Sequence, residues 1–286
     1  MLLQVSAASW GPQRVGAPQR ATDGAGIQAY VIDTGIRKTH RELAGRTDWI
    51  GDFVGATSLH PVSGDARDCD PADGHGTHVA GILAGRTYGI APAVTLHALR
   101  ILPCTGTTRT DPEAAIHAVD WITESGRKPA VVNISPLRWE TTDTRLDDAI
   151  RRSIRAGFVY VVSAGGMADL SRFTPQRIEE VIVVGATTPD DRAMQSDYGP
   201  RLTLFAPGTK TQAAGSASDD AIVGGDGDSY AAPVVAGIVA MYLQRNTGAS
   251  PADAKRAVVA AATRDAIANA GRAPNLLAHV IQPPSR

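Results

Sequence analysis

The chain has 286 residues, of which 43% are hydrophobic and 20% charged. This length and composition are typical of one large globular domain that buries its own core. The formal net charge of −1 argues against nucleic acid or an anionic membrane as a partner. No apolar run approaches the ~20 residues of a membrane-spanning helix, and the stretch Met1–Val5 is too short, and lacks the basic flank, for a signal peptide.

Short β-branched runs alternate with helical patterns along the chain, which predicts an α/β fold with a mainly parallel sheet and helices on both faces. Asp111-Pro112 and Ser250-Pro251 are typical helix starts. The segments 51–73 and 210–228 are rich in Gly, Asp and Thr and are predicted to be loops. We expect strands at 28–33, 95–101, 130–134, 158–163, 181–186 and 203–206, and helices at 75–83, 112–124, 144–156, 229–245 and 251–262.

Three distant segments each supply one residue of a hydrolytic triad. Asp33 ends an apolar run, His75 opens a helix between glycines, and Ser229 opens another helix in the stretch GDSYAAPVVAG. A serine hydroxyl needs an adjacent base to act as a nucleophile. His75 would take the Ser229 proton and return it to the leaving amine, while Asp33 would orient the imidazole. Each motif alone also fits a plain turn or a helix cap.

The order Asp, His, Ser is that of subtilisin. With its three motifs, the chain resembles the subtilisin-like serine proteases, or subtilases, and is nearest to their proteinase K-like branch. The resemblance is clear from about residue 10 to 280. It implies a three-layer α/β fold, a single catalytic domain over residues 1–286, and a serine endopeptidase that forms an acyl-enzyme on Ser229.

The resemblance also implies a secretion signal and a pro-domain upstream. Neither is found in the sequence, so we expect a mature form or a chain made without them, with a separate pro-domain as a candidate partner. Cys69 and Cys104 stand at the two places that a disulfide joins in bacterial proteinase K-like proteases. A Cys69–Cys104 bridge implies a secreted protein, which we expect to be a monomer, whereas the alternative is two reduced thiols.

One departure from the family concerns the oxyanion hole. Gly166 stands where the family has an Asn whose side chain binds the oxyanion, so the Ser229 backbone N–H is the remaining donor. We expect slow amide hydrolysis, a preference for esters, and faster turnover in a Gly166→Asn variant. Alternatively, another donor or a water fills the gap, or the glycine is a deliberate substitution. Asp228 replaces a threonine; we expect it to cap the helix, and its charge would favour protonated His75 and oppose the oxyanion.

A second departure concerns substrate selection. Pro136, Leu137 and Arg138 follow Ser135 where the family has Leu-Gly-Gly. These residues are predicted to narrow or reshape the first specificity pocket, whose opposite wall is Ala164 and Gly165. An extended peptide or protein substrate is expected to add as a strand at the edge between Leu102 and Gly106.

No cofactor is expected. Thr203 replaces an Asp that holds calcium in proteinase K-like enzymes. The acidic loop 65–70 and the pair Asp219-Asp220 are solvated loop charges or, alternatively, ion ligands. His75 and His78 lack the glutamate and the third ligand of a metalloprotease motif, so His78 is predicted to be a packed helix residue.

Three other functions remain open. Gly166 and Asp228 favour a pseudoprotease, a peptide-binding module on the same fold. The altered pocket also suits a dedicated precursor-maturation protease or an acyl transferase that ligates peptides. A metal hydrolase is the third alternative, and a chelator would abolish its activity.

Overall fold

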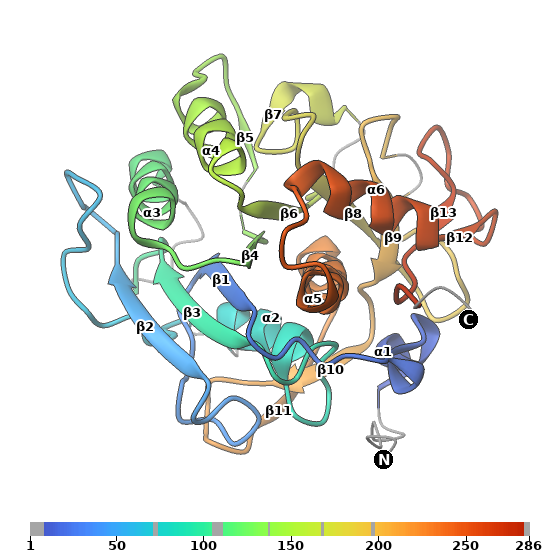
Figure 1. Ribbon diagram of the computed structural model, residues 1–286, viewed down its shortest axis with the longest axis horizontal. Coiled ribbons are helices and arrows are strands. Elements are labelled where there is room, and N and C mark those ends of the chain that lie inside the picture. The colour runs from blue at the N-terminus through green and yellow to red at the C-terminus, as the bar shows by residue number, and fades with distance from the viewer. Residues whose placement is uncertain are drawn as a thin grey trace.

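The computed structural model describes residues 9–70, 74–104, 111–136, 138–166, 169–195 and 198–282. Its centre is a nine-stranded sheet with the strand order β12-β13-β9-β8-β6-β4-β1-β3-β2 (Figure 1). Neighbouring strands run parallel except β12 and β13. The strands of this sheet are β1 (Gln28–Asp33), β2 (Thr47–Asp52), β3 (Thr95–Arg100), β4 (Ala130–Ile134), β6 (Val159–Ser163), β8 (Ile182–Thr187), β9 (Leu204–Pro207), β12 (Thr263–Arg264) and β13 (Leu276–Leu277).

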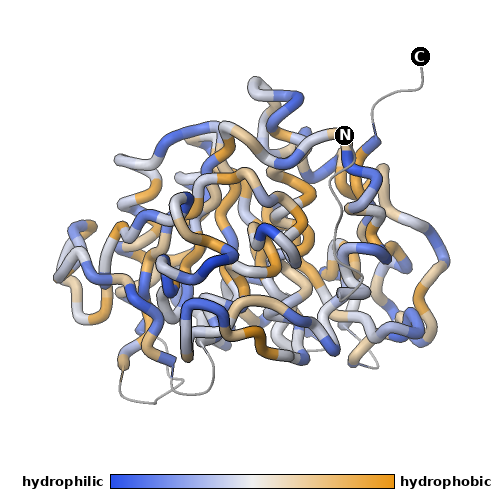
Figure 2. The backbone as a smooth tube through the Cα atoms, turned by 90° about the horizontal axis from the view of Figure 1, so that it is seen from below, coloured by the Kyte–Doolittle hydropathy of each residue, from blue (hydrophilic) through white to orange (hydrophobic). Residues whose placement is uncertain are grey.

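Helices cover both faces of the sheet and make three layers. One hydrophobic cluster fills the space between the sheet and the side of α2, α5 and α6, and a second fills the side of α3 and α4 (Figure 1). The hydrophobic segments run through the middle of the fold (Figure 2). None of the helices in the described ranges is long and apolar enough to cross a membrane. The α-helices are α1 (Trp10–Arg14), α2 (His75–Ala84), α3 (Pro112–Ser125), α4 (Arg145–Arg155), α5 (Asp228–Arg245) and α6 (Pro251–Ala261), and two short 3-10 helices span Ala17–Gln19 and Leu170–Arg172.

The predicted fold class is confirmed, and the six predicted strands and five predicted helices agree with the structure to within one residue at each end. Continuous apolar runs mark the central strands because both of their faces are buried. The predicted helix starts are also confirmed. The Asp111 side chain accepts the Glu113 N–H, and Ser250 accepts the Asp253 N–H.

The sequence prediction missed the polar and short elements. Strand β2 lies at the edge of the sheet, and most of its residues (TDWIGD) are polar or partly exposed, so it lacks the apolar run of a central strand. The predicted loop 210–228 contains an antiparallel pair, β10 (Thr211–Ala214) and β11 (Ile222–Gly225), beside α2. A second small pair is β5 (Trp139–Glu140) with β7 (Phe173–Thr174). These strands lie outside the main sheet, so no burial pattern marks them.

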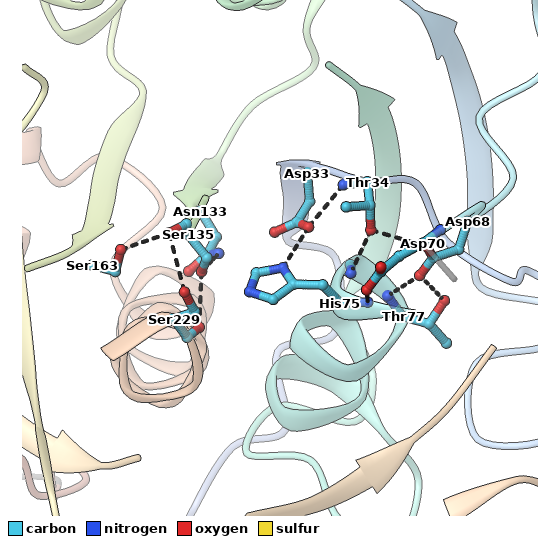
Figure 3. Close-up of polar contacts among 11 residues, drawn as sticks. Asp33, Thr34, Asp68, Asp70, His75, Thr77, Asn133, Ser135, Ser163 and Ser229 are labelled. Atoms are coloured by element: carbon cyan, nitrogen blue, oxygen red, sulfur yellow. Dashed lines mark hydrogen bonds and ion pairs between the residues drawn. The ribbon is translucent and has the colours of Figure 1, made fainter. Parts of the chain in front are cut away.

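The topology brings three strand ends and two helix starts together. Strands β6, β4 and β1 are neighbours, and their carboxyl ends carry Ser163, Ser135 and Asp33. Helices α2 and α5 begin at the same edge with His75 and Ser229 near their first turns (Figure 3). The carboxyl edge of a parallel sheet is the usual place for functional groups in α/β folds.

Candidate active site

Asp33 and His75 form a direct pair. Asp33 is fully buried, and its Oδ1 accepts hydrogen bonds from His75 Nδ1 at 2.7 Å and from the Thr34 N–H at 2.7 Å (Figure 3). A carboxylate on Nδ1 selects the tautomer with its proton on that nitrogen. The other ring nitrogen, Nε2, is then free to accept a proton.

The start of helix α2 is held by two aspartates of the acidic loop 65–70. Asp70 Oδ2 accepts the His75 N–H at 3.0 Å, while Asp68 Oδ2 accepts the Thr77 N–H at 2.8 Å and the Thr77 hydroxyl at 2.6 Å (Figure 3). Acceptors here satisfy N–H groups that have no partner inside the helix. The prediction that these two side chains are solvated loop charges is therefore wrong, because they anchor the helix that carries His75.

The two histidines of α2 have different proton affinities. Burial lowers the pKa of His75, but the charge and hydrogen bond of Asp33, with the charges of Asp68 and Asp70, outweigh it and leave that pKa above its usual value. For His78, burial and the charge of His75 lower the pKa to about 4.

The surroundings of His78 agree with a structural role. His78 Nε2 lies 3.0 Å from Thr211 Oγ1, and the Tyr230 ring lies against both His78 and His75. No group of three His, Cys, Asp or Glu side chains within the described ranges could hold a metal ion. His78 is the packed helix residue that the sequence predicted.

Ser229 is the second residue of α5, and the His75 ring lies between it and Asp33 (Figure 3). Its Oγ donates to the Ser135 carbonyl at 3.3 Å, and no hydrogen bond joins it to His75 among the residues described. Such bonds are often long in a free enzyme and tighten with substrate. The Ser229 backbone N–H, in the first helical turn, has no intrahelical acceptor.

Ser135 is fixed beside the nucleophile by its neighbours. Asn133 Nδ2 donates to Ser135 Oγ at 2.9 Å, and Ser135 Oγ donates to the Ser229 carbonyl at 2.9 Å. The Ser163 hydroxyl donates to the Ser135 carbonyl at 2.6 Å. These bonds tie the ends of β4 and β6 to α5.

A hollow of about 350 Å³ opens next to Ser229. Of the predicted substrate-binding residues, Ser135, Pro136 and Gly165 line it, whereas the Ala164 side chain is buried in the core. Leu102 is also buried. Gly106 and Leu137, which the sequence also predicted for substrate binding, lie outside the described residues. The full lining is Ser135, Pro136, Arg138, Ser163, Gly165, Gly166, Met194, Gln195, Gly227, Asp228 and Ser229.

Asp228 does not cap its helix, so that prediction is wrong. The cap position is Gly227, and the buried Asp228 side chain turns toward the strand ends instead. Its Oδ1 accepts the Ala186 N–H at 2.8 Å and the Tyr198 hydroxyl at 2.7 Å, and its Oδ2 accepts the Gly166 N–H at 2.6 Å. Burial raises the pKa of Asp228, although these three donors and the nearby Arg138 cation oppose the rise.

The predicted disulfide is confirmed: Cys69 is bonded to Cys104. The Arg100 guanidinium donates to both sulfurs, at 3.4 and 3.0 Å, and also to Asp52 Oδ2 at 2.6 Å. Because Cys69 lies between the two aspartates that hold α2, the bridge stabilises the segment that positions His75.

Thr203, which replaces a calcium ligand of the family, and the pair Asp219-Asp220 are engaged in protein contacts. Thr203 Oγ1 accepts the Val183 N–H at 3.0 Å. Asp219 pairs with Arg37, and Asp220 lies 3.7 Å from Arg41. These acidic side chains therefore lie beside cationic partners.

The sequence reasoning missed five residues that surround the triad and support it. They are Thr34, Asp68, Asp70, Tyr198 and Tyr230. Asp68 and Asp70 flank Cys69, and a disulfide at Cys69 fixes this loop near His75. Their position in the sequence could therefore have predicted that they lie close to the active site. Nothing local marks Tyr198.

The chain is similar to known serine proteinases. The model of the Subtilase family matches residues 24–276. An extracellular serine proteinase of Thermus sp. (strain Rt41A) is 41% identical over 283 residues, 95% of this chain and 66% of that protein. Alkaline serine exoprotease A of Vibrio alginolyticus is 36% identical over 84% of this chain and 43% of its own length.

Alkaline protease 2 of Aspergillus fumigatus is 33% identical over 89% of this chain and 54% of its own length. This chain thus spans 43 to 66% of these three relatives. The crystal structure of a cold adapted subtilisin-like serine proteinase superposes with a TM-score of 0.88 at 32% identity, over 97% of this chain and 100% of that one. The family match, which covers most of the chain, shows that the chain belongs to the subtilase family.

Proposed function

We propose that this protein is a serine endopeptidase that cleaves peptide bonds through an acyl-enzyme on Ser229. The observation that carries the proposal is the 2.7 Å bond between His75 Nδ1 and Asp33 Oδ1, with Nε2 free on the side of Ser229 (Figure 3). His75 takes the Ser229 proton as base and gives it to the leaving amine as acid. Asp33 stabilises the imidazolium that forms between these two transfers.

The substrate is a peptide or protein segment in extended conformation, bound by strand addition at the edge after β3. We propose a single catalytic domain that works as a secreted monomer without a cofactor. The disulfide supports an oxidising compartment, and the first relative described above is an extracellular enzyme by its name. A pro-domain remains a candidate partner.

A second candidate is a pseudoprotease that binds peptides without cleaving them. The observation that favours it is Gly166, which offers no side-chain donor to the oxyanion, with its N–H already bonded to Asp228. The intact Asp33–His75 pair favours the enzyme over this alternative. A dedicated maturation protease or peptide ligase would use the same triad with a narrower choice of substrate.

A fluorophosphonate probe separates these functions. It is expected to label the purified protein on Ser229, and Ser229→Ala should abolish labelling. Ser58→Ala, a matched change at an exposed loop serine, should leave labelling intact. Loss of labelling in Ser229→Ala with peptide hydrolysis in the parent establishes the endopeptidase. A parent protein that binds peptides but neither reacts with the probe nor hydrolyses them would establish the pseudoprotease.

A further inference from the structure

In the segment 163–166, Gly166 offers no hydrogen-bond donor to an oxyanion formed at Ser229. Gly166 has no side chain, and its N–H donates to Asp228 Oδ2 at 2.6 Å. Gly165 and Gly166 have φ values of +70° and +71°, in the left-handed region that glycine adopts readily. The Gly166 N–H is thus engaged, whereas the Ser229 N–H remains available to an oxyanion.

A carboxamide from another segment lies beside this gap. A Cβ atom placed on Gly166 would lie 3.4 Å from Gln195 Nε2 and 3.8 Å from Gln195 Cδ. Gln195, Gly166 and Ser229 line the same hollow. Within the described part of the chain, the Gln195 carboxamide makes no hydrogen bond, so its N–H groups are available to a substrate.

The segment that carries Gln195 is held on both sides. The Met194 N–H donates to the Ala186 carbonyl of β8 at 2.9 Å, and the buried Tyr198 hydroxyl donates to Asp228 Oδ1 at 2.7 Å. Asp228 Oδ2 holds Gly166 at the same time. One buried carboxylate therefore ties the glycine turn to the segment that supplies the carboxamide.

We propose that Gln195 supplies the second oxyanion donor, and that Asp228 is the residue that positions it. This inference rests on the proposed endopeptidase function. When Ser229 Oγ attacks the substrate carbonyl, the C–O bond forms, the carbonyl π electrons move to oxygen, and the serine proton goes to His75 Nε2. The Ser229 N–H and a Gln195 Nε2–H donate to that oxygen. On collapse the carbonyl re-forms, and the amine leaves with the proton from His75.

Gln195→Ala tests this role. Because the donor acts on charge that develops in the transition state, kcat should fall roughly 10²- to 10³-fold with KM changed by less than about threefold. The affinity of a peptide aldehyde, whose hemiacetal carries the same oxyanion, should fall by about the factor lost in kcat/KM. Gln195→Met keeps the length of the side chain without its donors and should show the same losses as Gln195→Ala. Gln212→Ala, an exposed matched change on β10, should leave kcat unchanged.

Gly166→Asn distinguishes a filled hole from a half-empty one. Contrary to the expectation from the sequence, Gly166→Asn in the parent should raise kcat by less than about threefold, because the Gln195 carboxamide already occupies the adjoining space. In the Gln195→Ala background, it should restore kcat at least roughly tenfold.

Two results would overturn the inference. One is a Gln195→Ala or Gln195→Met variant with parental melting temperature and parental kcat. The other is a Gly166→Asn single variant at least roughly tenfold faster than the parent, which would mean that the second donor was missing. Failure of the parent to react with the fluorophosphonate is a separate result, since it contradicts the proposed function itself.

Discussion

Replacing Asp228 with alanine tests whether this carboxylate holds the loops around the nucleophile together. The change removes the acceptor of three donors: the Gly166 N–H, the Ala186 N–H and the Tyr198 hydroxyl. Gly166 is half-buried and can bond to water, whereas Ala186 and Tyr198 are fully buried. Each buried donor left unpaired costs about 1–3 kcal/mol. The variant no longer buries a carboxylate, which offsets part of the cost of the unpaired donors. We therefore expect the free energy of unfolding to fall by about 2–4 kcal/mol.

The measurement is a urea titration followed by tryptophan fluorescence, with every variant in the Ser229→Ala background to prevent self-digestion. Asp228→Asn is the matched control. Its carboxamide oxygen keeps the two buried donors paired and loses the Gly166 bond, so it should cost about 1 kcal/mol. A loss below about 1 kcal/mol for Asp228→Ala, or equal losses for both variants, would refute the assignment of the stability to these hydrogen bonds.

Because Asp33 holds the pKa of His75 above its usual value, kcat/KM should rise with pH through a midpoint above about 6.5. The stability that the Asp33–His75 pair contributes should be complete below the unfolded pKa of about 6.5 and should decline as pH rises through the folded pKa. Asp33→Asn should lower kcat/KM by about 10⁴, near the loss that removal of this carboxylate causes in subtilisin. The pH–rate profile of this variant should have its midpoint at a lower pH than that of the parent, because His75 loses the charge of Asp33. Reducing the Cys69–Cys104 bond, which spans 35 residues, should lower the free energy of unfolding by about 3–4 kcal/mol; an unchanged urea midpoint in dithiothreitol would contradict this. EGTA should leave the melting temperature unchanged, because Thr203 uses its hydroxyl inside the sheet; a clear drop in calorimetry would show a calcium site.

The secondary structure of this chain was largely a local property. The strands at Gln28–Asp33 and Ala130–Ile134 were predictable because both faces of a central strand are buried, which makes their sequences continuously apolar. The helix at Pro251–Ala261 was predictable because the capping interaction of Ser250 lies within three residues of the helix start. The edge strand Thr47–Asp52 was missed because an edge strand has no such run.

The sequence by itself also indicated the candidate triad, and the family resemblance implied the disulfide. Asp33, His75 and Ser229 lie in short motifs, and the glycines and the order of these motifs can be recognised in the sequence alone. Cys69 and Cys104 were the two cysteines available, at the places that the resemblance implied. A motif records which residue types the chemistry needs, and that information is local.

The tertiary structure decided how these residues are held. Asp228 was predicted to be a helix cap from its place in the sequence. Its carboxylate instead accepts the backbone N–H groups of Ala186 and Gly166, which lie 42 and 62 residues away along the chain. Gln195 reaches the site in the same way, from the segment after β8. The orientation of a polar side chain depends on which donors and acceptors surround it in space. When those partners come from distant segments, no local pattern records them, and only the packed fold does.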